Sequence, residues 1–106
     1  MTTIVNIGRN FSPNHPTLAN VPMLDSSWQN FIDGVKSALA TQGGKDIHVF
    51  TGYSRYNGVG EDSASIQVFD DDNLNLRTLR LYLAQIAVAY AQDSIALTVA
   101  ETEFVS

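Results

Sequence analysis

Two stretches of this chain repeat apolar residues at spacings of three and four, and these stretches limit the possible folds more than any other feature. The first carries Trp28, Phe31, Ile32, Val35 and Leu39, and the second carries Leu76, Leu79, Leu83, Ile86 and Tyr90. This spacing places apolar side chains along one side of an α-helix. We therefore expect one helix from about residue 26 to the glycines at 43 and 44, and another over 74–91.

Polar residues mark where each helix should begin. Ser26, followed three residues later by Gln29, matches a capping box, and Asn73 is a candidate N-cap for the second helix. The three aspartates at 70–72 suit the positive end of that helix. We prefer this role to a metal site, because consecutive carboxylates point in different directions and no EF-hand spacing surrounds them. We expect neither a metal nor a cofactor.

Four segments with β-strand character surround the helices, over residues 3–7, 46–53, 63–69 and 95–105. In the third segment Ala64, Ile66 and Val68 alternate with Ser63, Ser65 and Gln67. Such alternation is typical of an antiparallel sheet with one covered face. We interpret residues 52–62, between the second and third segments, as a projecting loop that is too long for a two-residue turn.

The order of the predicted elements is β-α-β-β-α-β. One sheet with two helices on one face gives an α+β, ferredoxin-like split βαβ arrangement. Right-handed crossovers then predict the strand order 4-1-3-2, with strands one and three parallel and the other neighbours antiparallel. We expect residues 1–106 to form a single domain. The open sheet face would carry His48 and Phe50, or the opposite set of side chains.

The amino-acid composition limits which kinds of molecule this chain is expected to bind. With 11 acidic and 6 basic residues the formal net charge is −5, which argues against binding of duplex nucleic acid. Charged residues make up only 16% of the chain, and this low share favours an oligomer that buries part of its surface. There is no cysteine, so disulfides and thiolate metal sites are excluded. The first residues resemble neither a signal peptide nor a membrane span, so we expect a cytoplasmic protein without a membrane partner.

The predicted loop concentrates the residues most suited to binding. Tyrosine rings offer flat faces for stacking, and an arginine offers a planar fork for a carboxylate or phosphate. The candidate residues for binding a ligand or partner are Tyr53, Arg55, Tyr56, Asn57, Arg9 and His48. The alternative is a solvated turn whose tyrosines pack on the sheet edge or on another chain. We identify no catalytic residues.

The second predicted helix carries another apolar set on its far side. Leu74, Leu81 and Val88 recur at a spacing of seven, roughly opposite the first stripe. A small domain rarely buries a helix all round, so we predict that these residues form an interface in a homodimer or a higher oligomer. The alternative is that they are scattered exposed residues.

Three functional classes follow. The preferred one is a non-enzymatic, homo-oligomeric binding module that sequesters a small anionic ligand or blocks a partner protein, as phage-encoded accessory proteins of this size do. The second is a small dimeric α+β-barrel enzyme that uses His48 in a sheet-face cavity; a cavity lined by His48 and Gln67 would favour it. The third is a structural component of a larger assembly. The chain contains no thiol nucleophile and no GxSxG, P-loop or HExxH motif.

Three short motifs resemble an uncharacterised bacterial family of small proteins, some of them described as lipoproteins. The motifs are Trp28-Gln29-x-Phe31, Glu61-x-Ser63 at the end of the hairpin, and Gln92-Asp93-Ser94-Ile95. The resemblance would span roughly residues 5–100. This chain lacks the secretion signal of many such proteins and carries Tyr53 and Arg55 where a Gly- and Trp-rich hairpin is expected. The resemblance implies the same fold and adds no activity.

Overall fold

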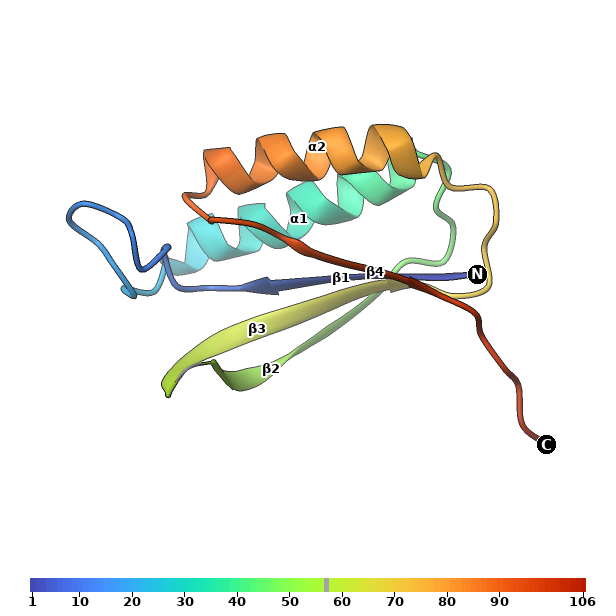
Figure 1. The fold of residues 1–106 in the computed structure, drawn as a ribbon, viewed down its shortest axis with the longest axis horizontal. Helices are drawn as coiled ribbons and strands as arrows, with labels where there is room; N and C mark the ends of the chain where they lie inside the picture. Colours follow the sequence, from blue (N-terminus) through green and yellow to red (C-terminus); the bar gives the residue numbers. More distant parts are fainter. Residues whose placement is uncertain (57) are drawn as a thin grey trace.

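The computed structural model describes residues 1–56 and 58–106, apart from the side chain of Tyr56. Its elements are β1 (Thr2–Gly8), α1 (Asp25–Thr41), β2 (His48–Tyr56), β3 (Val59–Val68), α2 (Leu76–Ala89) and β4 (Ala96–Ala100). They form an α+β, ferredoxin-like arrangement with both helices on one face of a four-stranded sheet, as predicted (Figure 1). Among the described residues, no helix is both long and apolar enough to cross a lipid bilayer.

The strands lie in the predicted order, written from one edge of the sheet as β2-β3-β1-β4. All three neighbouring pairs are antiparallel, so the predicted parallel pairing of β1 with β3 is wrong. The crossover through α1 makes β1 and β2 run in the same direction, and the β2–β3 hairpin then reverses the chain. β3 must therefore run antiparallel to β1.

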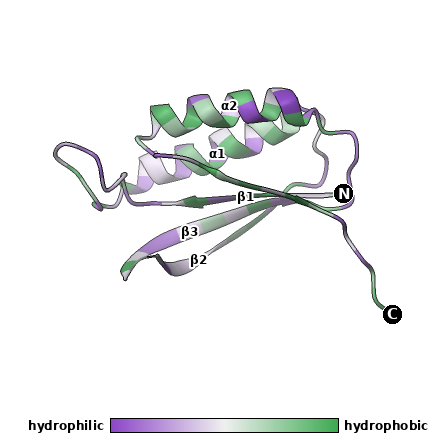
Figure 2. Cartoon of the chain, viewed as in Figure 1, coloured by the Kyte–Doolittle hydropathy of each residue, from purple (hydrophilic) through white to green (hydrophobic). Residues whose placement is uncertain are grey.

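The β2–β3 hairpin is longer than the sequence analysis predicted. The two strands pair continuously from His48 opposite Gln67 to Tyr56 opposite Val59, so most of the predicted loop 52–62 is strand. The sequence does contain the relevant signal, because the dipeptide Asn57-Gly58 strongly favours a two-residue hairpin connection. The hairpin leads away from the helices in Figure 1, and Figure 2 shows β3 as more hydrophilic in its half near the tip.

The core lies between the sheet and the two helices. The predicted alternation in β3 is confirmed, because Ala64, Ile66 and Val68 are buried. Both predicted helical stripes contribute buried residues, including Phe31, Leu39 and Leu79. Burying one such large side chain contributes about 1.5–3 kcal/mol to folding. In the described part of the chain, both helices lie on the same side of the sheet, and no helix covers the opposite face (Figure 1).

Both predicted N-caps are wrong. Leu24 is the N-cap of α1 and makes no capping bond through its side chain, so Ser26 lies inside the first turn. For α2 the N-cap is Asn75, whose side chain accepts a hydrogen bond from the Thr78 amide at 3.1 Å. Asn73 lies earlier, in a turn closed by the Asp71 carboxylate. The aspartates at 70–72 precede the helix, as predicted, but residues 73 and 74 separate them from its N-cap.

Both helices end in the same two-bond pattern. After α1, the amides of Gly43 and Gly44 donate to the carbonyls of Ala40 and Leu39. After α2, the amides of Ala91 and Gln92 donate to Val88 and Ala87. The pattern requires a left-handed residue, which is Gly43 at φ 102° in one case and Ala91 at φ 51° in the other. Glycine adopts this conformation without cost, whereas alanine does not.

The predicted oligomer interface is only partly exposed. Leu81 and Val88 are 62% and 81% exposed on α2. Leu74 precedes the helix and is buried in the core, so its assignment to an exposed stripe is wrong. The heptad argument fails at Leu74 because the residue is not helical.

The last strand is shorter than predicted. β4 ends at Ala100 instead of continuing to residue 105. Residues 101–106 form no strand and lead away from the body of the molecule (Figure 1).

Candidate functional site

The hairpin separates the predicted site residues onto two faces. Side chains of a strand alternate between the two sides of the sheet, so Tyr53 and Arg55 belong to the side that faces the helices, and His48 to the open side. Tyr53 is 67% exposed. The side chain of Tyr56 and the whole of Asn57 lie outside the described residues, so their predicted roles stay predictions.

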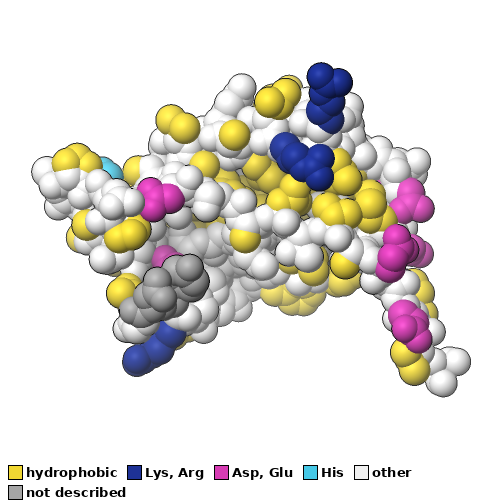
Figure 3. Space-filling view, in the orientation of Figure 1, with side chains coloured by type: hydrophobic (Ala, Val, Ile, Leu, Met, Phe, Trp, Pro, Cys, Tyr) yellow, Lys and Arg dark blue, Asp and Glu magenta, His cyan; other side chains and the backbone are white. Residues whose placement is uncertain are grey.

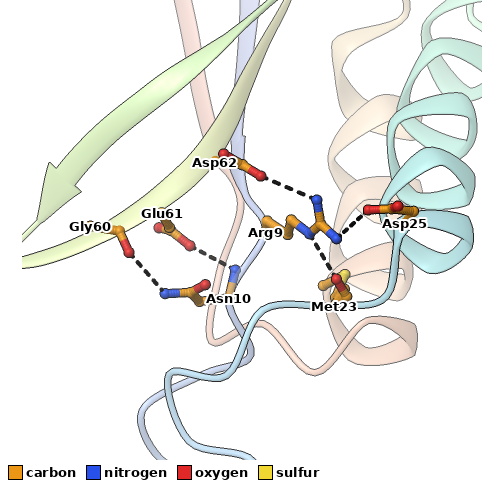
Figure 4. A network of polar contacts seen from close by, with 7 residues as sticks. All are labelled: Arg9, Asn10, Met23, Asp25, Gly60, Glu61 and Asp62. Carbon is orange, nitrogen blue, oxygen red and sulfur yellow. Dashed lines mark hydrogen bonds and ion pairs between the residues drawn. The ribbon is translucent and has the colours of Figure 1, made fainter.

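Arg9 lies at the end of β1, where its guanidinium meets three internal acceptors (Figure 4). It donates to the carbonyl of Met23 at 2.7 Å, to Asp62 at 3.1 Å and to Asp25 at 2.6 Å. The hydrogen bond to Asp25 is the main cause that raises the pKa of Arg9 above its ordinary value. This arginine therefore ties β1 to the hairpin and to the start of α1, and its charge is already balanced.

Asn10, the next residue, connects different parts of the structure. Its amide donates to the Glu61 carboxylate at 2.7 Å, and its side chain donates to the carbonyl of Gly60 (Figure 4). Its own carbonyl accepts a hydrogen bond from the side chain of Gln92 at 2.9 Å. Asn10 thus joins the hairpin to the turn that follows α2.

A second connection fixes that turn. The hydroxyl of Ser12, which is buried, donates to the Asp93 carboxylate at 2.6 Å, and the side chain of Asn14 donates to its other oxygen at 3.2 Å. The Ser12 amide also donates to the carbonyl of Ala91. The loop after β1 therefore holds Asp93 in place.

These connections border a groove of about 950 Å³ on the open face of the sheet. One wall is the hairpin and the other is formed by the loop after β1 and the turn after α2. The lining includes Asn6, Phe11, Phe50, Glu61, Ser65 and Asp93. This volume is within the range of small-molecule sites.

A smaller hollow of about 480 Å³ lies on the other side of the hairpin, against α1. Tyr53 and Asp62 line it from the hairpin, and Trp28 lines it from the helix. Of the predicted binding residues, Tyr53 lines this hollow and Arg55 lines the larger groove. Arg9 lines neither and is connected to the smaller hollow only through its hydrogen bond to Asp62.

His48 lines neither hollow, and its role in a sheet-face cavity of a dimeric enzyme stays a prediction. Its ring lies 5.3 Å from that of Phe69 and 6.4 Å from that of Phe50, centroid to centroid. Neither His48 nor Gln67 lines the larger groove. In the part of the chain that the structure describes, no group of three or more His, Asp or Glu residues is placed to hold a metal ion.

Three polar residues of the groove, Asn10, Glu61 and Asp93, were not among the predicted binding residues. Alternation along β3 could have placed Glu61 beside Ser63 and Ser65 on the open face. No local signal could have placed Asp93 opposite the hairpin, because that position depends on contacts across the fold.

Comparisons with known proteins add little to this geometry. No family model matches the chain, and no curated protein matches its sequence. A phage SAM lyase in its apo state has a similar structure, with a TM-score of 0.49 and 18% identity over 91% of this chain and 75% of that one. A likeness this distant carries no inference about function. The bacterial family suggested by the short motifs stays a prediction.

Proposed function

We propose that this chain is a non-enzymatic, self-associating binding module that captures its target with the β2–β3 hairpin. The observation that carries the proposal is the hairpin itself, which has a hollow on each side and carries the exposed ring of Tyr53. Concave surfaces with a few polar and aromatic groups are the usual form of ligand sites.

On the helix-facing side of the hairpin, the target is a small anion or an acidic surface of a partner protein. Arg55 supplies the cation, and the neighbouring Tyr53 supplies a stacking face. Arg9 is not part of this capture, because Asp25 and Asp62 already bind its guanidinium.

Self-association would use α2. Leu81 and Val88 project from its outer side, and hydrophobic side chains gather beside basic ones in the region of Figure 3 where Figure 1 places α2. The large groove lies on the opposite sheet face, so an interface through α2 would leave it open. The same interface, repeated, would serve the alternative role as a component of a larger assembly. No observation favours the enzyme.

The hairpin is tested with the double variant Tyr53→Ala plus Arg55→Ala. We expect it to lose the binding of citrate or inorganic phosphate that the native protein shows in amide NMR titrations, with an unchanged melting temperature. The matched control is Tyr82→Ala plus Arg77→Ala, which removes the same residue types from α2 and should bind as the native protein does. Equal binding by both double variants, or no binding by the native protein, would contradict anion capture at the hairpin.

Self-association is tested with Leu81→Glu plus Val88→Glu in light scattering and native mass spectrometry. The charges should shift the protein toward monomer, because a carboxylate is costly to bury at an apolar contact. Ala40→Glu, at an exposed position of α1, is the control and should leave the oligomer intact. A native protein that is already monomeric at micromolar concentration would refute the interface.

A further inference from the structure

The carboxylates of Glu61 and Asp93 line the large groove together with Arg55, and neither carboxylate forms an ion pair with it. Among the described residues, the ion pairs involve only Arg9 or the terminal amine, so neither Glu61 nor Asp93 has an ionic partner there. Glu61 accepts from the Asn10 amide, and Asp93 accepts from neutral side chains. Neither carboxylate is therefore balanced by an ion pair among the described residues.

The Glu61 carboxylate is held in one place. It lies over the α-carbon of Gly8, where a methyl group at residue 8 would overlap it. The hydrogen bond from Asn10 fixes the same carboxylate from the other side. Such positioning reduces the entropy that a ligand contact would otherwise cost.

An aromatic ring completes the lining. Phe50 neighbours Ser65 on the open face, lines the groove and is 53% exposed. The face of an aromatic ring attracts cations, most strongly where water is partly excluded. Arg55 also lines the groove, at a strand position that alternation assigns to the helix-facing side, and it forms no ion pair with Glu61 or Asp93.

From these observations we propose that the groove binds a small organic cation, such as an ammonium, sulfonium or guanidinium compound. Glu61 and Asp93 balance the charge of the ligand, and the ring of Phe50 contacts its cationic centre. Small anions are excluded from this groove by the two carboxylates. The inference rests on the hairpin as the binding element but assigns its open side, whereas the anion capture proposed above uses the helix-facing side.

The experiment titrates the protein with choline and follows amide NMR signals. The matched neutral probe is the dimethylbutanol in which carbon replaces the choline nitrogen, so the two ligands share their shape and differ in charge. We expect choline to shift signals of groove residues such as Asn6, Ser63 and Ala96, and the neutral alcohol to bind about tenfold or more weakly.

Three variants locate the site. Glu61→Gln and Asp93→Asn should each weaken choline binding about tenfold, as expected for the loss of one charged contact. Glu61→Gln keeps an oxygen that accepts from Asn10, so the fold is retained. Phe50→Leu should weaken binding about threefold to tenfold through the loss of the ring. Asp33→Asn removes the same charge from exposed α1 and should change nothing.

The choline titrations have outcomes that support the cation site and outcomes that refute it. Charge-dependent binding that Glu61→Gln and Asp93→Asn lose and Asp33→Asn retains supports the proposal. Equal binding of the neutral alcohol, equal effects of Glu61→Gln and Asp33→Asn, or no binding of choline overturns it. A protein that binds citrate through Tyr53 and Arg55 but not choline refutes the cation site alone and leaves the proposed function intact.

Discussion

The two faces of the β2–β3 hairpin differ in how their carboxylates are partnered. On the helix-facing side, Asp62 shares the Arg9 guanidinium with Asp25. On the open side, Glu61 has only the Asn10 amide as its described partner. Glu61 and Asp62 are neighbours in β3, so strand alternation places their side chains in the two environments.

This difference separates a structural role from a binding role. A carboxylate that is paired with an internal arginine ties elements together and has little left to offer a ligand. A carboxylate that is held in place but forms no ion pair can still bind a cationic ligand. Residue type therefore does not distinguish the two roles, since acidic residues occupy both faces.

The largest effect is expected from Arg9→Met, which removes the paired charge. The substitution leaves Asp25 and Asp62 close to each other without their cation, and leaves the Met23 carbonyl without its donor. We expect the greatest fall in melting temperature among the changes considered in this comparison, with choline binding intact because Asn10 holds Glu61 through its backbone. Arg80→Met on α2 removes the same charge and serves as the control. A melting temperature no lower than that of the control would show that the network does not stabilise the fold.

The second test places a methyl group beneath one side chain on each face. Gly8→Ala would displace the Glu61 carboxylate, and Gly60→Ala would displace the ring of Tyr53. Because Glu61 is held by Asn10 and Tyr53 is largely exposed, we expect Gly8→Ala to cost about 1–2 kcal/mol of stability and Gly60→Ala to cost much less.

The two glycine variants should also differ in which ligand they bind less tightly. Gly8→Ala should weaken choline and spare citrate, whereas Gly60→Ala should affect citrate and spare choline. Urea unfolding and the two titrations measure both effects. If each variant changed both ligands equally, the two faces would not be independent.

Much of the fold could be predicted from the sequence, because it depends on periodic burial. The stripe from Trp28 to Leu39 and the alternation from Ser63 to Val68 determine which side of each element is buried, and the element order then limits the topology. The extent of the hairpin was missed because the polar, aromatic residues 52–62 were interpreted as a loop despite Asn57-Gly58.

The site could not be predicted to the same degree. Arg9 was expected to join Arg55 at a ligand, but its actual partners lie 16 and 53 positions away in the sequence. Ser12 and Asp93 are separated by 81 positions. Such pairs follow from the packed structure, and a single sequence carries no local signal for them.

The remaining comparison concerns the wall of the groove that carries Asp93. Ala91 begins this wall in a left-handed conformation, at the position where Gly43 ends α1. Ala91→Gly should remove that strain and stabilise the protein by about 0.5–1 kcal/mol in urea unfolding. Gly43→Ala is the reciprocal change and should destabilise it by about 1 kcal/mol or more, because the added carbon would also lie 3.2 Å from the Asn73 carbonyl oxygen.

The choline affinity of Ala91→Gly shows whether the backbone strain at Ala91 contributes to ligand binding in the groove. Ser12 and Asn14 hold the Asp93 carboxylate directly, so Ala91→Gly should leave the affinity for choline unchanged. Weaker choline binding in a more stable protein would mean that the left-handed alanine positions Asp93. In that case the open face would depend on backbone strain, whereas the helix-facing side depends on paired charge.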